Sequence, residues 1–180
     1  MLEISVGETE LFDEETFRII RTKPTVLKLE HSLLSISKWE SKWKIPFLKE
    51  KEKTTEQFID YVRCMTITQN VDPKVYQGLR PSELIEIKSY IDDPMTATWF
   101  NEKQSAKRSS RVVTSELVYC WMAQNNIPFE CEKWNFNRLI TLIRVCNAEN
   151  APQKKMGRDK TARQNAALNA KRKQAMRTRG

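Results

Sequence analysis

The 180-residue chain has little of several residues on which protein chemistry often depends: four glycines, four cysteines and one histidine. With so few glycines, a glycine-built phosphate cradle is nearly excluded, and no glycine-based nucleotide or hydrolase motif occurs. The cysteines are Cys64, Cys120, Cys131 and Cys146; they include no C-x-x-C pair, so neither a zinc site nor a disulfide framework is expected. The sequence therefore predicts no metal and no cofactor.

Long hydrophobic runs are also absent. No stretch of about 18 apolar residues occurs, and the first residues lack the basic and hydrophobic regions of a signal peptide. We therefore expect a cytoplasmic protein without membrane contact.

Positive charge is abundant and unevenly distributed. The chain has 31 Lys and Arg against 23 Asp and Glu, a formal net charge of +8. Residues 154–180 hold ten of those bases and one of those acids, which leaves 21 bases and 22 acids in residues 1–153, a net charge of −1. Any attraction to acidic partners therefore belongs to the C-terminal tail rather than to the rest of the chain.

Composition also divides the chain into two parts. All five tryptophans lie in residues 1–152, whereas residues 153–180 contain no aromatic residue and are rich in alanine. We expect one globular α+β domain over 1–152. A basic Ala-rich tail over 153–180 follows, helical or disordered until it meets a partner.

Helical patterns dominate the first part. Thr54 and Gln57 form a capping box ahead of an apolar stripe at i, i+3, i+4 and i+7, and Asp72-Pro73 begins a short helix. Six helices are expected, beginning near residues 35, 54, 73, 81, 115 and 134. The helix over 117–123 is expected to be buried nearly all round, and it and the helix over 134–147 are expected to form the centre of the core.

Strand patterns are fewer. Alternation of apolar and polar residues predicts strands over 2–6 and 26–30, while residues 8–15 fit either a helix or an extended segment. A further strand over 95–100 is expected to pair with 111–113 across a polar loop that holds Lys103, Lys107 and Arg108. The expected fold class is thus α+β and predominantly helical, with about six helices, a small antiparallel sheet and a basic C-terminal tail.

Candidates for catalysis are few. Glu30 and His31 are adjacent in a strand pattern and so point to opposite faces, which favours a structural or surface histidine over a catalytic dyad. Asp92-Asp93 before a proline is typical of a solvated turn. Trp39 and Trp43 fit either a nucleobase-stacking surface or inward packing, and their helical phase favours packing. No catalytic residue is predicted, and we expect a non-enzymatic protein.

The tail is the strongest candidate for partner binding. Its basic residues are spread around all sides of any helix, which suits wrapping or neutralisation by an acidic partner better than groove readout. A solubilising tail without a partner is the other interpretation. The candidate residues are Lys154, Lys155, Arg158, Lys160, Arg163, Lys171, Arg172, Lys173, Arg177 and Arg179.

Five segments together resemble a family of tailed-bacteriophage proteins associated with tail assembly chaperones. The resemblance covers about residues 29–180 and is carried by residues 31–40, 113–117, 127–131, 137–147 and 163–169. It implies a non-enzymatic morphogenesis factor in the host bacterial cytoplasm, which binds the elongated tape measure protein and recruits tail-tube subunits. The resemblance implies no catalytic residue.

Two functional hypotheses follow. The leading one is a phage tail assembly chaperone that uses exposed helix faces and the basic tail, as a monomer or an oligomer. The alternative is a nucleic-acid-binding phage protein whose C-terminal tail neutralises phosphates.

Overall fold

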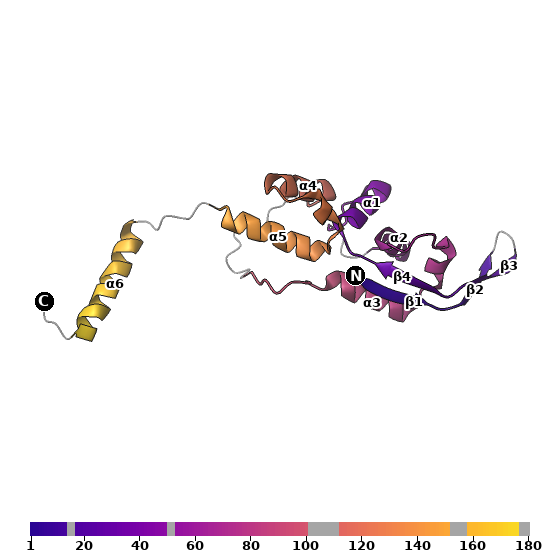
Figure 1. Ribbon diagram of the computed structural model, residues 1–180, viewed down its shortest axis with the longest axis horizontal. Helices are drawn as coiled ribbons and strands as arrows, with labels where there is room; N and C mark the ends of the chain where they lie inside the picture. The colour runs from indigo at the N-terminus through magenta and orange to yellow at the C-terminus, as the bar shows by residue number, and fades with distance from the viewer. Residues whose placement is uncertain (14–16, 50–52, 101–111, 152–157, 177–180) are drawn as a thin grey trace. The chain divides into compact units, whose positions relative to one another are not determined.

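The computed structural model describes residues 1–13, 17–49, 53–100, 112–151 and 158–176. The chain divides into two compact units, Met1–Ala148 and Glu149–Gly180. The fold is α+β and predominantly helical, as the sequence predicts (Figure 1). No helix among the described residues is long and apolar enough to cross a membrane.

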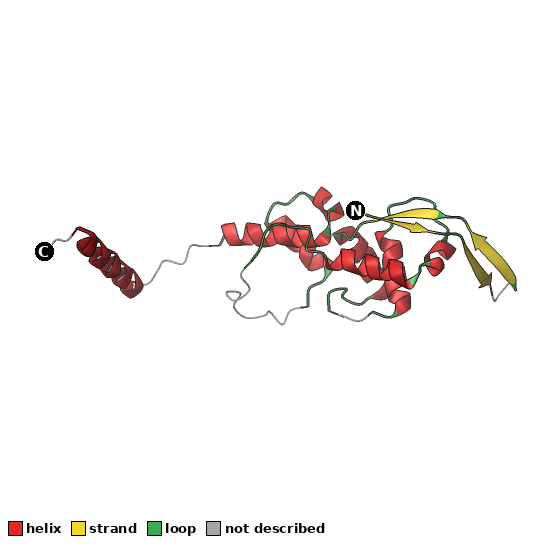
Figure 2. Ribbon diagram, turned by 90° about the horizontal axis from the view of Figure 1, so that it is seen from below, coloured by secondary structure: helices red, strands yellow, loops and turns green. Residues whose placement is uncertain are grey.

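Four short strands open the chain. β1 (Leu2–Val6) pairs antiparallel with β4 (Thr25–Leu29), and β2 (Thr9–Asp13) pairs antiparallel with β3 (Arg18–Thr22). The alternation that predicts β1 is visible in its burial, since Ile4 and Val6 are buried while Glu3 and Ser5 are exposed. The undecided segment 8–15 is extended over its described part, which forms β2. Figure 2 shows the strands beside the helices of the first unit.

Two capped helices follow the strands. In α1 (Leu33–Trp43), the Ser32 hydroxyl accepts from the backbone N–H of Ser35. α2 (Thr55–Met65) has the predicted capping box, in which Thr54 and Gln57 satisfy each other's backbone N–H groups. The residues after α2 then run back along β4, with Ile67 N–H donating to the carbonyl of Lys28 at 2.8 Å.

Further helices complete the first unit. They are the 3₁₀ helix η1 (Pro73–Gly78), α3 (Pro81–Asp92), α4 (Ser115–Gln124), the 3₁₀ helix η3 (Phe129–Lys133) and α5 (Phe136–Glu149). Predictions of helices near 73, 81, 115 and 134 are confirmed, with α5 beginning two residues later than expected.

The core is centred on the N-terminal half rather than on α4 and α5. Its most buried large side chains include Leu27 and Leu29 of β4, Trp39 of α1 and Tyr61 of α2, each 0% exposed. Of the twelve largest fully buried side chains among the described residues, only Met122 lies on α4 and only Leu139 on α5, so the prediction that these two helices form the centre of the core is wrong. The reason is geometric, because α1 contacts both α2 and α4 and so occupies the central position.

The prediction that α4 is buried nearly all round is also wrong. Val118 and Met122 are fully buried, whereas Cys120 and Ala123 are exposed. One side of α4 faces α1 and the other faces solvent, so an apolar sequence here produces an exposed apolar side.

The predicted strand over 95–100 does not form. Residues 93–100 have no strand structure, and Asp93 and Thr96 instead accept hydrogen bonds from the backbone N–H groups of Met95 and Thr98. These local turns compete with strand pairing. Residues 112–113 of the predicted partner are also not in a strand. Arg111 and the basic spot at Lys103, Lys107 and Arg108 lie outside the described residues.

The second unit contains α6 (Arg158–Met176), so the tail forms a helix over its described part. Its five alanines, with no glycine or proline, account for the helical propensity. Leu168 and Met176, its two large apolar side chains, are 47% and 73% exposed.

Candidate binding surfaces

His31 lies at the floor of an apolar groove rather than at an exposed strand end. It is 2% exposed, and its ring packs edge-on against Tyr61 and Phe136. Its Nδ1 shares a hydrogen bond with the Tyr61 hydroxyl, which also lies 3.3 Å from Ser35 Oγ. Of the two placements that the sequence favours for this histidine, structural or surface, the contacts show the buried one.

Burial keeps the His31 ring neutral. Burial first, and the nearby Lys53 ammonium second, lower the pKa of His31 from 6.5 to about 4. Burial likewise raises the pKa of the Tyr61 hydroxyl, which therefore stays protonated at neutral pH. The neutral His31 ring is thus one of the polar groups that line the groove.

The groove is formed by several segments of the first unit. It has a volume of about 900 Å³ and lies between His31, the chain after α1, the start of α2, α3 and the start of α5. Two of its apolar side chains are well exposed, Leu48 at 44% and Ile85 at 69%. The lining residues are His31, Phe47, Leu48, Lys53, Thr55, Phe58, Leu84, Ile85, Lys88, Ile91, Asp92, Phe136 and Asn137.

The groove has a fixed floor and a charged rim. Lys53 donates to the carbonyl of Phe47 at 3.0 Å, and its ammonium lies 3.9 Å from the centre of the Phe47 ring. On the opposite side, Asn137 ties α5 to α3 by donating to the carbonyls of Ile91 and Asp93. A concave surface that combines apolar side chains with charged and polar ones suits an amphipathic helix or extended segment of another protein.

Glu40 joins α1 to the elements on either side of it. The spacing of Glu40 and Lys44 predicts an ion pair, but Glu40 is 8% exposed and its carboxylate accepts backbone N–H groups from Phe47 at 2.7 Å and Ser115 at 2.8 Å. Lys44 instead ends α1 in a left-handed conformation, with φ of 58°. Through Glu40, α1 fixes both the chain that lines the groove and the first N–H of α4.

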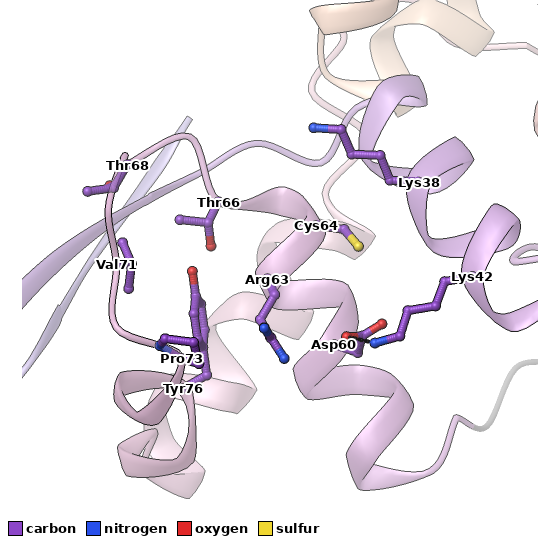
Figure 3. Close-up of a pocket in the computed structure, with 10 residues that line it drawn as sticks. All are labelled: Lys38, Lys42, Asp60, Arg63, Cys64, Thr66, Thr68, Val71, Pro73 and Tyr76. Atoms are coloured by element: carbon purple, nitrogen blue, oxygen red, sulfur yellow. Dashed lines mark hydrogen bonds and ion pairs between the residues drawn. The ribbon is translucent and has the colours of Figure 1, made fainter.

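A second hollow, of about 430 Å³, lies on another face of α1 and α2 (Figure 3). The Asp60 carboxylate accepts a hydrogen bond from the Lys42 ammonium and another from Trp43 Nε1. Burial acts to raise the pKa of Asp60, but these two hydrogen bonds and the nearby cations outweigh it and lower the pKa. The lining residues are Lys38, Lys42, Asp60, Arg63, Cys64, Thr66, Thr68, Val71, Pro73 and Tyr76.

The predicted tail residues are partly described. Arg163, Lys171, Arg172 and Lys173 are exposed on α6. At about 100° per residue, these four point to four different sides of the helix, as the sequence predicts. Arg158 and Lys160 belong to the first turn of the same helix. Lys154, Lys155, Arg177 and Arg179 lie outside the described residues.

Trp39 and Trp43 pack inward as predicted. Trp39 is fully buried and donates from Nε1 to the carbonyl of Gln57 at 2.9 Å. Other aromatic side chains, which no sequence motif marks, are exposed. Trp99 is 85% exposed, and Trp134 is 40% exposed with the Arg138 guanidinium 4.8 Å from its ring centre.

The four cysteines are all free thiols. Within the described part of the chain, no group of three or more His, Cys, Asp or Glu side chains is placed to hold a metal ion. Asp92 and Asp93 are exposed, as expected of a solvated turn.

Three comparisons of the chain, with models of protein families, with curated proteins and with solved structures, find no match.

Proposed function

We propose that this chain is a non-enzymatic tail assembly chaperone of a tailed bacteriophage. In this proposal it binds the elongated tape measure protein and tail-tube subunits in the host bacterial cytoplasm. The observation that carries the binding role is the apolar groove, which exposes Leu48 and Ile85 around a buried floor. The phage assignment is supported by the sequence resemblance over about residues 29–180.

The groove suits a helical partner. The resemblance implies a long, helical tape measure protein as the partner. Such a partner presents many amphipathic helical turns. Apolar side chains of one turn fill the groove beside Ile85, while acidic side chains reach the rim ammonium groups of Lys53 and Lys88. The neutral His31 ring at the floor adds one hydrogen-bonding position that can select a polar side chain among the apolar ones.

The basic helix suits a second, less specific contact. Arg163, Lys171, Arg172 and Lys173 point to all sides of α6, so the helix can meet an acidic surface in any rotation. Exposed charge of this kind speeds association more than it adds affinity, and its effect is screened by salt.

Co-expression with the tape measure protein tests the proposal, with a groove variant and a matched control. Ile85→Lys places a charge on the groove, whereas Ile19→Lys makes the same change at a 66% exposed position of β3. We expect wild-type chain and Ile19→Lys to keep the tape measure protein soluble and to co-purify with it. Ile85→Lys should weaken binding at least about tenfold, since burying an unpaired ammonium is costly.

Both substituted positions are exposed, so both variants should melt near the wild-type temperature. Equal binding by wild type and Ile85→Lys would remove the groove from the interface. A failure of the wild-type chain to bind or solubilise the tape measure protein would reject the chaperone function itself.

The alternative, nucleic-acid binding, has its own supporting observations. The tail holds ten basic residues, and Trp99 and the Trp134–Arg138 pair expose the aromatic and cationic surface that single-stranded nucleic acids use for stacking. The groove has no role in that alternative, so the Ile85→Lys variant would bind nucleic acid as the wild type does.

A further inference from the structure

We propose that the hollow between α1, α2 and η1 binds the phosphate group of a small molecule. This site is separate from the apolar groove, and the proposal does not depend on the function proposed above. Three cations line the hollow, Lys38 and Lys42 from α1 and Arg63 from α2, against the single carboxylate of Asp60. The lining thus carries a net charge of +2, in a part of the chain (residues 1–153) whose net charge is −1.

The one carboxylate is already occupied. Asp60 accepts from the Lys42 ammonium and from Trp43 Nε1, so its direct ion pair is with Lys42. Among the described residues, no carboxylate lies within ion-pair distance of Lys38 or Arg63. Two positive charges therefore face the hollow without an internal counter-ion.

Arg63 is held in a geometry that suits phosphate. Its guanidinium carbon lies 5.7 Å from the ring centre of Tyr76, and that residue is only 5% exposed. A guanidinium beside an aromatic ring can use the N–H groups at its edge for a bidentate phosphate contact. The Tyr76 hydroxyl points toward Thr66 along the same wall (Figure 3).

The Cys64 thiol lines the hollow together with the three cations. Burial and then the Asp60 carboxylate raise the pKa of this thiol, while Lys42, Lys38 and Arg63 each act to lower it. The field of all three cations therefore extends into the hollow. An anion in that space would be attracted by all three at once.

The walls of the hollow are tied down before any ligand binds. Thr68 Oγ1 accepts from the N–H of Lys28 and donates to the carbonyl of Val26, which fixes the loop after α2 against β4. Such preorganisation lowers the cost of binding. The volume of about 430 Å³ exceeds that of a phosphate alone, so the remaining space suits the organic part of a phosphate monoester.

Thermal melts of the full chain test the site, with inorganic phosphate and adenosine monophosphate as probes. Each is used at roughly 10 mM and compared with chloride at equal ionic strength, because phosphate also stabilises proteins without binding. For a dissociation constant of about 1 mM, the melting temperature should rise by roughly 2–5 °C above the chloride value. A larger rise with adenosine monophosphate identifies a phosphorylated small molecule, whereas equal rises identify the phosphate group alone.

The variant Lys38→Gln/Arg63→Gln removes the two unpaired cations, and Lys133→Gln is the control at an exposed lysine of η3, outside the hollow. The control should keep the full stabilisation, while the double variant should lose it and show at least a tenfold weaker affinity by calorimetric titration. Both altered side chains are exposed, so the double variant should fold. Equal stabilisation of wild type and double variant, or no stabilisation of the wild type by either probe, would overturn the proposal.

Discussion

The two units of the chain each contain regular α-helices, but these helices are stabilised by different interactions. α1 is 11 residues long, begins at a capping box and buries Leu33, Ile36 and Trp39 in the core. α6 is 19 residues long, and its described side chains are all exposed. Packing therefore determines α1, whereas α6 depends on alanine propensity, which gives only marginal stability to a helix in water.

This difference separates two ways of recognising a partner. The first unit presents hollows of defined shape, because hydrogen bonds such as those of Glu40 and Asn137 fix their walls. In the second unit, the described side chains of α6 present charge on all sides of the helix and form no apolar face. We expect substitutions in the first unit to alter shape and specificity, and changes in the second to alter association rate and salt dependence.

The largest effect should come from the core of the first unit. Trp39→Ala removes a fully buried indole whose N–H donates to Gln57, and we expect a loss of about 3–5 kcal/mol in the free energy of unfolding. Trp99→Ala is the matched control, because Trp99 is 85% exposed and should change stability by less than about 0.5 kcal/mol. Urea denaturation measures both. Similar losses for the two variants would contradict this account of the core.

The second largest change in stability is expected when the pH is lowered. The folded-state pKa of His31 is lowered to about 4, so the unfolded chain binds a proton more readily and stability falls as pH drops from 6.5 toward 4. The loss in the free energy of unfolding that is due to His31 should reach about 3 kcal/mol near pH 4. Below pH 4, His31 should cause no further loss. Carboxylates such as Asp60, whose pKa is also lowered, contribute at lower pH, below their ordinary value of about 3.9.

The single histidine makes this prediction directly measurable. His31 gives the only imidazole resonances in the NMR spectrum of the chain, so its titration can be followed without assignment. In denaturation experiments, His31→Gln should flatten the change in stability between pH 6.5 and 4.5. A native midpoint near 6.5 would show that the ring is solvated rather than buried.

The smallest effect should come from the tail. Deleting residues 154–180 removes three large apolar side chains, of which the two on α6, Leu168 and Met176, are exposed, and should lower the melting temperature of the remaining chain by less than about 4 °C. Calorimetry checks this expectation. A larger fall would show that the tail contributes substantially to the stability of the first unit.

Local signals in the sequence predict much of the fold. Thr54 and Gln57 predict the start of α2, because a capping box depends only on two residues three positions apart. Alternation predicts β1 and the charged tail is visible from composition alone. The strand expected over 95–100 fails because β propensity depends on a pairing partner, which residues 112–113 do not supply.

The candidate sites are less accessible to sequence analysis because they depend on distant contacts. Glu40 accepts a hydrogen bond from Ser115, 75 residues away, so its local spacing to Lys44 is a misleading signal. The groove and the hollow between α1, α2 and η1 are each lined by several segments of the chain. The sequence shows which residues share one face of a helix, but not which helices come together. His31 is conspicuous in the sequence as the one histidine, but its position beneath the groove depends on contacts with Tyr61 and Phe136, which the sequence does not reveal.

The salt dependence of binding tests the central claim, that the partner is a protein held by the groove and assisted by the tail. The affinities of the full chain for the tape measure protein and for DNA and RNA are measured between about 50 and 200 mM salt. We predict tight binding to the tape measure protein, with salt chiefly slowing association. Tight nucleic-acid binding with a log–log slope near −5, as expected for about six neutralised phosphates, together with no binding of the tape measure protein, would contradict the account.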